Sequence, residues 1–191
     1  MSRQLTAFTP DQIGWSETTL QNLGENDVRV VSEFSAAKHG TELVMYKGKG
    51  SHRGGWDKNL QLHTLEATAN TTPTNVPLGN CAVGKVVETG SNVKDLQKGD
   101  RVLAYEVPFR EEHVLSATRC FKLPESCPWQ SAACADPAVF ALGAVRDGHI
   151  RVGDRVVVFG LGAIGLMTVQ LAKRAGASQV IAFDPIEQRQ D

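Results

Sequence analysis

The sequence predicts an α/β protein with a β-rich N-terminal part, followed by a parallel β-α-β unit. Between residues 27 and 123, short apolar or alternating segments separated by polar turns indicate several closely spaced strands, as in a small barrel or sandwich. After residue 128 the pattern changes to an Ala-rich helical segment and then to continuous apolar runs. Such runs are typical of strands buried on both faces of a parallel sheet. We therefore expect two domains, residues 1–150 and 151–191.

The elements of the first domain follow from local patterns. Residues 27–37 alternate as a half-buried strand, and residues 40–46 form a short apolar segment that predicts a helix. Residues 47–77 are polar and rich in Gly, Thr and Asn, which predicts a long surface loop. Further strands, joined by tight turns, are expected within residues 83–88, 99–105 and 112–123.

The first domain ends with an Ala-rich connecting segment, residues 129–145, which predicts a helix bent at Pro137. The β-α-β unit then follows in order. Its expected elements are a strand at Val156–Phe159, a helix at Ile164–Ala175 that Gly176 ends, and a strand at Val180–Phe183.

A glycine-rich motif joins the first of these strands to the helix. It reads G-x-G-x-x-G and consists of Gly160, Leu161, Gly162, Ala163, Ile164 and Gly165. Gly160 permits a tight turn, Gly162 lets the backbone approach a pyrophosphate, and Gly165 lets the helix pack closely on the strand. The N–H groups and positive end of the helix attract phosphates. Because the motif lies between a predicted strand and a predicted helix, it indicates a dinucleotide-binding site.

An acidic residue completes this pattern. Such a residue is expected about 20 residues after the motif, at the end of the second strand. Asp184 directly follows the run that ends at Phe183. A carboxylate accepts hydrogen bonds from ribose hydroxyls and repels a 2′-phosphate, which favours NAD over NADP. NADP stays open, because Arg189 is near enough in sequence to pair with that phosphate.

Composition narrows the class of protein further. The 191 residues carry a net charge of −1, which provides no electrostatic basis for binding nucleic acid or a membrane surface. No apolar run approaches the roughly 20 residues of a membrane-spanning helix, and the N-terminal segment lacks a signal-peptide core. We expect a cytoplasmic protein whose partner is a small-molecule substrate. The four cysteines form no C-x-x-C pair and are expected to be reduced thiols.

Several segments resemble motifs of the medium-chain dehydrogenase/reductase superfamily. They are Ser35–Glu42, Pro77–Gly90, Gly99–Val102, Ala135–Pro137 and Gly153–Asp184. The resemblance implies a GroES-like barrel domain followed by the first βαβ unit of a Rossmann fold. It also implies an oxidoreductase that transfers a hydride between NAD(P)(H) and a small alcohol or carbonyl substrate.

The resemblance also shows where the chain departs from zinc-dependent members. Their zinc ligands correspond here to His39, to Asn80 with Cys81, and to Asp136. Asn is a poor zinc ligand, and the four-cysteine structural lobe has no counterpart after Tyr105, so zinc is not expected. The alternative is a residual metal site of His39, Cys81 and Asp136, which have the chemistry of a catalytic zinc site.

Thr41 occupies the position that in the family relays a proton from the substrate alcohol, two residues after the first ligand position. This makes Thr41 the candidate catalytic residue. The alternative is that Thr41 satisfies backbone N–H groups at the start of a helix, which Thr does well.

The length of the second part leads to a further expectation. Only 37 residues (191 − 154) follow Asp154, enough for a β-α-β unit, whereas a doubly wound domain has about six strands. The sequence thus looks truncated within the dinucleotide-binding domain. The alternative function is a non-catalytic fragment that binds at most the ADP half of the cofactor or acts as a pairing module. A homo-oligomer is expected.

Overall fold

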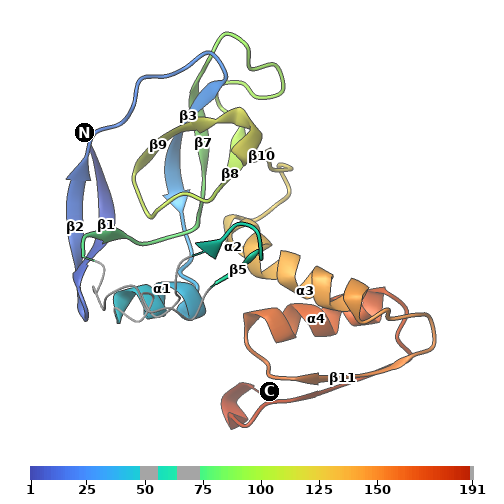
Figure 1. Cartoon of the computed structure of the whole chain (residues 1–191). Coiled ribbons are helices and arrows are strands. Elements are labelled where there is room, and N and C mark those ends of the chain that lie inside the picture. The colour runs from blue at the N-terminus through green and yellow to red at the C-terminus, as the bar shows by residue number, and fades with distance from the viewer. Residues whose placement is uncertain (48–55, 64–73, 190–191) are drawn as a thin grey trace. The chain divides into compact units, whose positions relative to one another are not determined.

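The computed structural model describes residues 1–47, 56–63 and 74–189 of the chain (Figure 1). It divides into two compact units, Met1–Ala133 and Cys134–Asp191. The helix α3 (Ala135–Asp147) groups with the second unit because it packs against α4 (Ala163–Arg174), whereas the sequence placed these residues in the first domain.

The first unit is built on a five-stranded antiparallel sheet with the order β10-β8-β7-β3-β9. Its strands are β3 (Asp27–Phe34), β7 (Cys81–Thr89), β8 (Arg101–Tyr105), β9 (Glu112–Ser116) and β10 (Cys120–Lys122), with a 3-10 turn at Ala117–Arg119. These positions confirm the strands expected from the sequence. The two long strands, β3 and β7, pair with two register shifts, at Arg29/Val30 and at Ser32/Phe34.

Small aliphatic side chains fill the core beneath this sheet. The buried cluster consists of Val28, Val30, Ala82, Val86, Leu96, Val102, Ala104, Val107 and Leu115. Val28 and Val30 of β3, Ala82 and Val86 of β7, and Val102 and Ala104 of β8 share inward positions, because alternate residues of a strand point to the same face. The alternating apolar positions that predicted the strands thus form this core.

A second sheet of the first unit, with the order β2-β1-β6, contains an N-terminal hairpin that the sequence analysis did not predict. Its strands are β1 (Ser2–Thr9), β2 (Gln12–Thr18) and β6 (Val76–Pro77). The buried positions of β1 include the polar residues Ser2, Gln4 and Thr6, which conceal the usual apolar alternation. Thr6 and Ser16 satisfy each other through a 2.7 Å hydrogen bond between their hydroxyls, and Gln4 accepts hydrogen bonds from Arg110.

The segment expected to be a long loop, residues 47–77, contains short strands where the structure describes it. Besides β6, these are β4 (Trp56–Asp57) and β5 (Leu62–His63), which pair with each other. Residues 48–55 and 64–73 of this expected loop lie outside the described residues. The short helix α1 (His39–Tyr46) precedes the segment and confirms the helix expected at residues 40–46.

The Ala-rich segment forms two helices instead of one bent helix. The helix α2 (Trp129–Ala133) ends before Cys134, and α3 begins at Ala135. Pro137 has no N–H to donate to the carbonyl of Ala133, four residues earlier, and its ring crowds that carbonyl. The proline therefore interrupts the helix on its N-terminal side, and Pro137 itself lies in the first turn of α3, where proline is tolerated.

The second unit contains the expected β-α-β arrangement. The parallel strands β11 (Arg155–Phe159) and β12 (Gln179–Phe183) pair in register, and α4 connects them. Gly176 has a φ of +105° at the end of α4, which confirms it as the residue that stops this helix. A 3-10 turn at Glu187–Arg189 follows β12.

One face of the two-stranded sheet is exposed, so the expectation of strands buried on both faces is wrong for this structure. Val157 and Phe159 are 50% and 83% exposed, and Ile181 and Phe183 on the neighbouring strand are 41% and 53% exposed. The rings of Phe159 and Phe183 stack with their centroids 5.7 Å apart. The helix α4 covers only the opposite face, on which Val158 is buried. No helix among the described residues has the length and apolarity needed to cross a bilayer.

His113 of β9 provides a prediction about acid stability. The side chain is buried, its Nε2 lies 3.1 Å from the hydroxyl of Ser32, and its pKa is lowered from 6.5 to about 4, first by burial and then by the charge of Arg110. Between pH 6.5 and 4 the unfolded chain binds a proton that the folded chain does not. The free energy of unfolding should therefore fall as the pH decreases through this window, by up to about 3 kcal/mol.

The measurement is urea unfolding between pH 7 and 4.5. His113→Gln should flatten the pH dependence, whereas the exposed His149→Asn should leave it unchanged; Asn suits the φ of +51° at that position. Parallel pH profiles for wild type and His113→Gln would contradict the assignment.

Candidate functional site

The candidate site is the turn between β11 and α4, which lies in the second unit. Gly160 follows β11 with a φ of +93°, a conformation that residues with a Cβ rarely adopt. Its N–H donates to the carbonyl of Phe183 at 2.6 Å, so the turn begins hydrogen-bonded to the end of β12. This is the tight turn that the sequence assigned to the first glycine.

The other two glycines differ in what surrounds them. A Cβ added to Gly165 would overlap the carbonyl oxygen of Gly160, so no side chain fits between α4 and the turn. A Cβ added to Gly162 would meet no atom within 4 Å. Gly165 thus allows close packing of the helix, while the surface at Gly162 is open to an approaching group.

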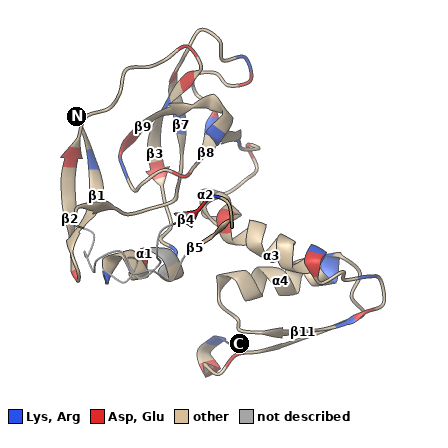
Figure 2. Cartoon of the chain, in the orientation of Figure 1, with Lys and Arg blue, Asp and Glu red and all other residues tan. Residues whose placement is uncertain are grey.

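The helix α4 presents its N-terminus at this open surface. Gly162 is the N-cap residue and provides no side-chain cap, and the first N–H groups of a helix have no carbonyl partner within it. In Figure 2, α4 carries no charged residue until its last turn, where Lys173 and Arg174 lie. The first turn therefore offers N–H donors and the positive end of the helix dipole, and α4 itself contributes no acidic side chain there.

Asp184 follows β12 and contacts the turn directly. Its Oδ2 accepts from the N–H of Leu161 at 2.7 Å, and its Oδ1 accepts from the N–H of Ile186 at 2.8 Å. The guanidinium of Arg189 lies 3.4 Å from Oδ2. These hydrogen bonds, with that of Leu161 first and that of Ile186 next, lower the pKa of Asp184 below its ordinary value despite desolvation by burial. The carboxylate is therefore ionised at neutral pH.

The structure thus brings together the glycine turn and the acidic residue that the sequence singled out 19 residues after Gly165 (184 − 165). The sequence analysis missed the hydrogen bonds of Asp184 to Leu161 and Ile186. The sequence does not show which backbone N–H groups the fold brings near a side chain, so these hydrogen bonds are seen only in the folded turn. The sequence analysis noted that Arg189 is close to Asp184 in sequence. The structure shows that the two side chains form an ion pair.

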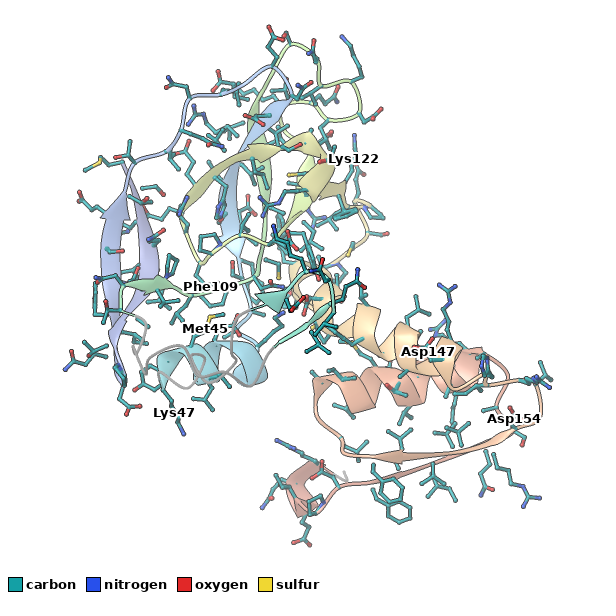
Figure 3. All side chains as sticks on the ribbon, in the orientation of Figure 1. Met45, Lys47, Phe109, Lys122, Asp147 and Asp154 are labelled. Atoms are coloured by element: carbon teal, nitrogen blue, oxygen red, sulfur yellow. The ribbon has the colours of Figure 1, made fainter. Side chains whose placement is uncertain are left out.

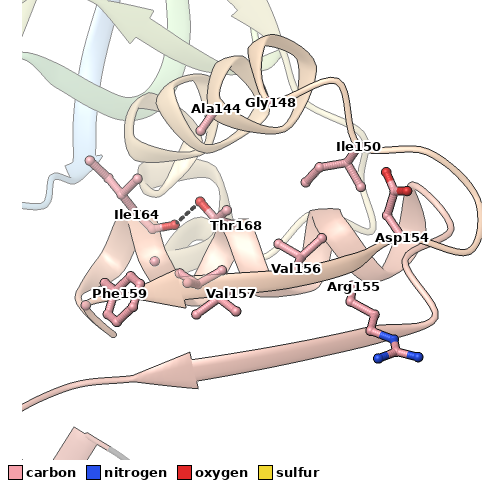
Figure 4. A pocket seen from close by; sticks show the side chains of 13 residues that line it. Ala144, Gly148, Ile150, Asp154, Arg155, Val156, Val157, Phe159, Ile164 and Thr168 are labelled. Carbon is pink, nitrogen blue, oxygen red and sulfur yellow. Dashed lines mark hydrogen bonds between the residues drawn. The ribbon is translucent and has the colours of Figure 1, made fainter.

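A hollow of about 640 Å³ lies between α3, α4 and β11 (Figure 4). Apolar side chains such as Ile150 and Val156 form much of its wall. Its charged lining residues, Asp154 and Arg155, lie at the opposite end of β11 from Phe159 (Figure 4). Gly160, Ile164 and Gly165 of the glycine turn also line the hollow, which therefore adjoins the backbone groups suited to a phosphate.

The candidate catalytic and metal residues are only partly described. His39 and Thr41 are the first and third residues of α1, but their side chains lie outside the described part of the structure. Cys81 and Asp136 are buried. Among the described residues, no group of three or more His, Cys, Asp or Glu side chains is placed to hold a metal ion. The role of Thr41 and the alternative metal site therefore stay predictions.

Comparison with known proteins identifies the class. Residues 25–129 match the family model of the alcohol dehydrogenase GroES-like domain. D-guloside 3-dehydrogenase of Escherichia coli (strain K12) is 40% identical over 197 aligned residues, which cover 99% of this chain and 56% of that protein. (R,R)-butanediol dehydrogenase of Bacillus subtilis (strain 168) is 31% identical over 149 residues, covering 64% of this chain and 42% of that protein. This chain therefore spans about half the length of these curated relatives.

Solved structures share the fold. The crystal structure of 2R,3R-butanediol dehydrogenase from Bacillus subtilis matches with a TM-score of 0.78 at 22% identity, covering all of this chain and 60% of that one. Galactitol-1-phosphate dehydrogenase from Escherichia coli matches with a TM-score of 0.76 at 21% identity, covering 98% of this chain and 57% of that one. The fold is that of an alcohol dehydrogenase-like protein. The chain belongs to the medium-chain dehydrogenase/reductase superfamily, through its alcohol dehydrogenase GroES-like domain, which confirms the resemblance found in the sequence.

The packing at Gly165 leads to a stability prediction. Gly165→Ala should lower the free energy of unfolding by about 1–3 kcal/mol, because the new methyl group displaces α4 from the Gly160 carbonyl. Gly143→Ala, inside α3 with open space around its Cβ, should instead raise it by about 0.5–1 kcal/mol. Chemical denaturation measures both. Equal effects of the two substitutions would contradict the close approach.

Proposed function

We propose that this chain provides the substrate domain and the ADP-binding turn of an oxidoreductase that transfers a hydride between NAD(P)(H) and a small alcohol or carbonyl substrate. The observation that carries the proposal is the turn at Gly160–Gly165, which combines a tight left-handed start, an open N-cap at Gly162 and an ionised Asp184 beside it. The relatives reported above, which are named as dehydrogenases, support the same class of reaction.

The residues of the turn fit a dinucleotide. The open surface at Gly162 leaves room for a pyrophosphate against the backbone, and the first turn of α4 supplies N–H donors. When bound, the nicotinamide supplies the hydride chemistry. This chain orients the adenosine and pyrophosphate part, and the first unit would orient the substrate.

We propose NAD(H) as the preferred cofactor. Asp184 is the acidic residue that the motif assigns to the ribose hydroxyls, and the charge of its ionised carboxylate opposes a 2′-phosphate. Arg189 favours NADP instead, because its positively charged side chain lies beside Asp184, is partly exposed and can pair with a 2′-phosphate. The preference for NAD over NADP is therefore expected to be moderate.

On the substrate side, we propose Thr41 as the residue that relays a proton from the substrate alcohol, because it stands two residues after the first ligand position of the family motif. The relatives are named for a guloside and a butanediol, which favours a substrate with more than one hydroxyl group. A homo-oligomer is also part of the proposal.

The cofactor proposal is tested by binding of ADP-ribose and its 2′-phosphate derivative to the chain of 191 residues. ADP-ribose should bind more tightly, and Gly162→Val should abolish binding of both, because its side chain occupies the place of the pyrophosphate. Gly143→Val is the matched control, since it also projects into open space but lies in α3. Titration calorimetry measures the affinities. Unchanged binding by Gly162→Val would refute the site, and tighter binding of the 2′-phosphate derivative would refute the preference.

We further propose that zinc takes no part, because the residues do not fit it. Asn80 stands where the family has a histidine ligand, and Asn is a poor ligand for zinc. Elemental analysis of the purified protein should find far less than about one zinc per chain. About one bound zinc that disappears in His39→Ala or Cys81→Ala would establish the alternative site of His39, Cys81 and Asp136.

A further inference from the structure

The carboxylate of Asp184 divides its two oxygens between two separate backbone donors. Oδ2 accepts from the N–H of Leu161 at 2.7 Å, and Oδ1 accepts from the N–H of Ile186 at 2.8 Å. The side chain is only 2% exposed, so little water competes for these hydrogen bonds. An amide could not replace the carboxylate, because one of its two polar atoms is a donor and would face an N–H group.

The contact with Leu161 continues a contact made one residue earlier. The N–H of Gly160 donates to the carbonyl of Phe183 at 2.6 Å, and the next N–H of the turn, that of Leu161, donates to Asp184. Two successive N–H groups of the turn are thus held by two successive residues at the end of β12. The following residue, Gly162, is the N-cap whose surroundings are open. Hydrogen bonds to Phe183 and Asp184 therefore hold the backbone of the turn in place just before the open surface.

We infer that Asp184 is a positioning residue for the phosphate-binding turn, a role separate from any hydrogen bond it accepts from a ribose. The inference rests on the proposed function, since it concerns the turn proposed to hold the pyrophosphate. It follows that Asp184 assists binding even of a ligand without a ribose, because it fixes the backbone that meets the phosphates.

Arg189 has a different role in this arrangement. Its guanidinium lies 3.4 Å from Oδ2 and its side chain is 46% exposed, whereas the two backbone hydrogen bonds are shorter. Arg189 compensates the charge of the carboxylate but does not contact the turn through a bond of its own among the described contacts. Removing Arg189 should therefore leave the position of the turn unchanged.

The test uses the chain of 191 residues with inorganic pyrophosphate and ADP as probes, followed by ¹⁵N-resolved NMR titration. Asp184→Asn should weaken pyrophosphate by about tenfold or more and accelerate hydrogen exchange at the Leu161 amide by a similar factor, since it removes a charge-assisted hydrogen bond. Arg189→Gln should leave hydrogen exchange at the Leu161 amide unchanged, because Arg189 makes no hydrogen bond to the turn among the described contacts. Asp154→Asn is the matched control, because Asp154 accepts from the N–H of Arg151 at 2.7 Å at the opposite end of β11 (Figure 3).

The outcomes separate this inference from the proposed function. Loss of ADP affinity in Asp184→Asn, with unchanged pyrophosphate affinity and Leu161 exchange, would show that Asp184 is only a ribose ligand and would overturn the inference. Wild-type protein that binds neither probe would overturn the proposed function, while faster Leu161 exchange in Asp184→Asn would still support the positioning role.

A measurement on wild-type protein covers the case in which Asp184→Asn does not fold. As the pH is lowered, the Leu161 amide proton should shift together with the titration of the Asp184 carboxyl, whose pKa lies below its ordinary value. A Leu161 shift that does not follow this titration would overturn the inference.

Discussion

The close approach of α4 to the turn after β11 is the constraint on which the second unit depends. No Cβ fits at Gly165 because the Gly160 carbonyl occupies its place. This contact sets the distance of the helix from the sheet, and the distance sets where the first N–H groups of α4 point. The surface at Gly162, by contrast, is open. Gly165 thus allows the helix to pack closely, and Gly162 leaves the backbone accessible.

The two units achieve stability in different ways. In the first, a core of Val, Ala and Leu is enclosed by antiparallel strands, and polar residues at inward positions of β1 find partners such as Ser16 and Arg110. In the second, two parallel strands have one covered face and one face on which Phe159 and Phe183 stack in the open. Parallel strands need cover on both faces to bury residues of this kind. In the second unit, α4 packs against α3 and against the covered face of the two strands.

The β-α-β unit and the strands of the first unit could be predicted because each carries a local signal. Continuous apolar runs mark β11 and β12, and the glycine motif lies where one run ends. The hairpin of β1 and β2 could not be predicted, because the inward side chains of Ser2, Gln4 and Thr6 are polar and are paired only by residues elsewhere in the chain. Burial on both faces was wrongly expected, because it depends on what covers the sheet and not on the strand itself.

The candidate site was predictable to the extent that it depends on residue type and spacing. Gly160, Gly162 and Gly165 have the separate surroundings that the motif predicts. The side chain of Asp184, however, serves the fold through two backbone N–H groups before any ligand is considered. Two separate roles can thus explain an acidic residue at the end of the second strand. It can recognise ribose hydroxyls, and it can hold the backbone of the turn in place. The second role acts equally whether or not the ribose carries a 2′-phosphate. The acidic residue alone is therefore a weaker indicator of NAD than its spacing suggests, and the charge balance between Asp184 and Arg189 becomes the quantity that decides between the two cofactors.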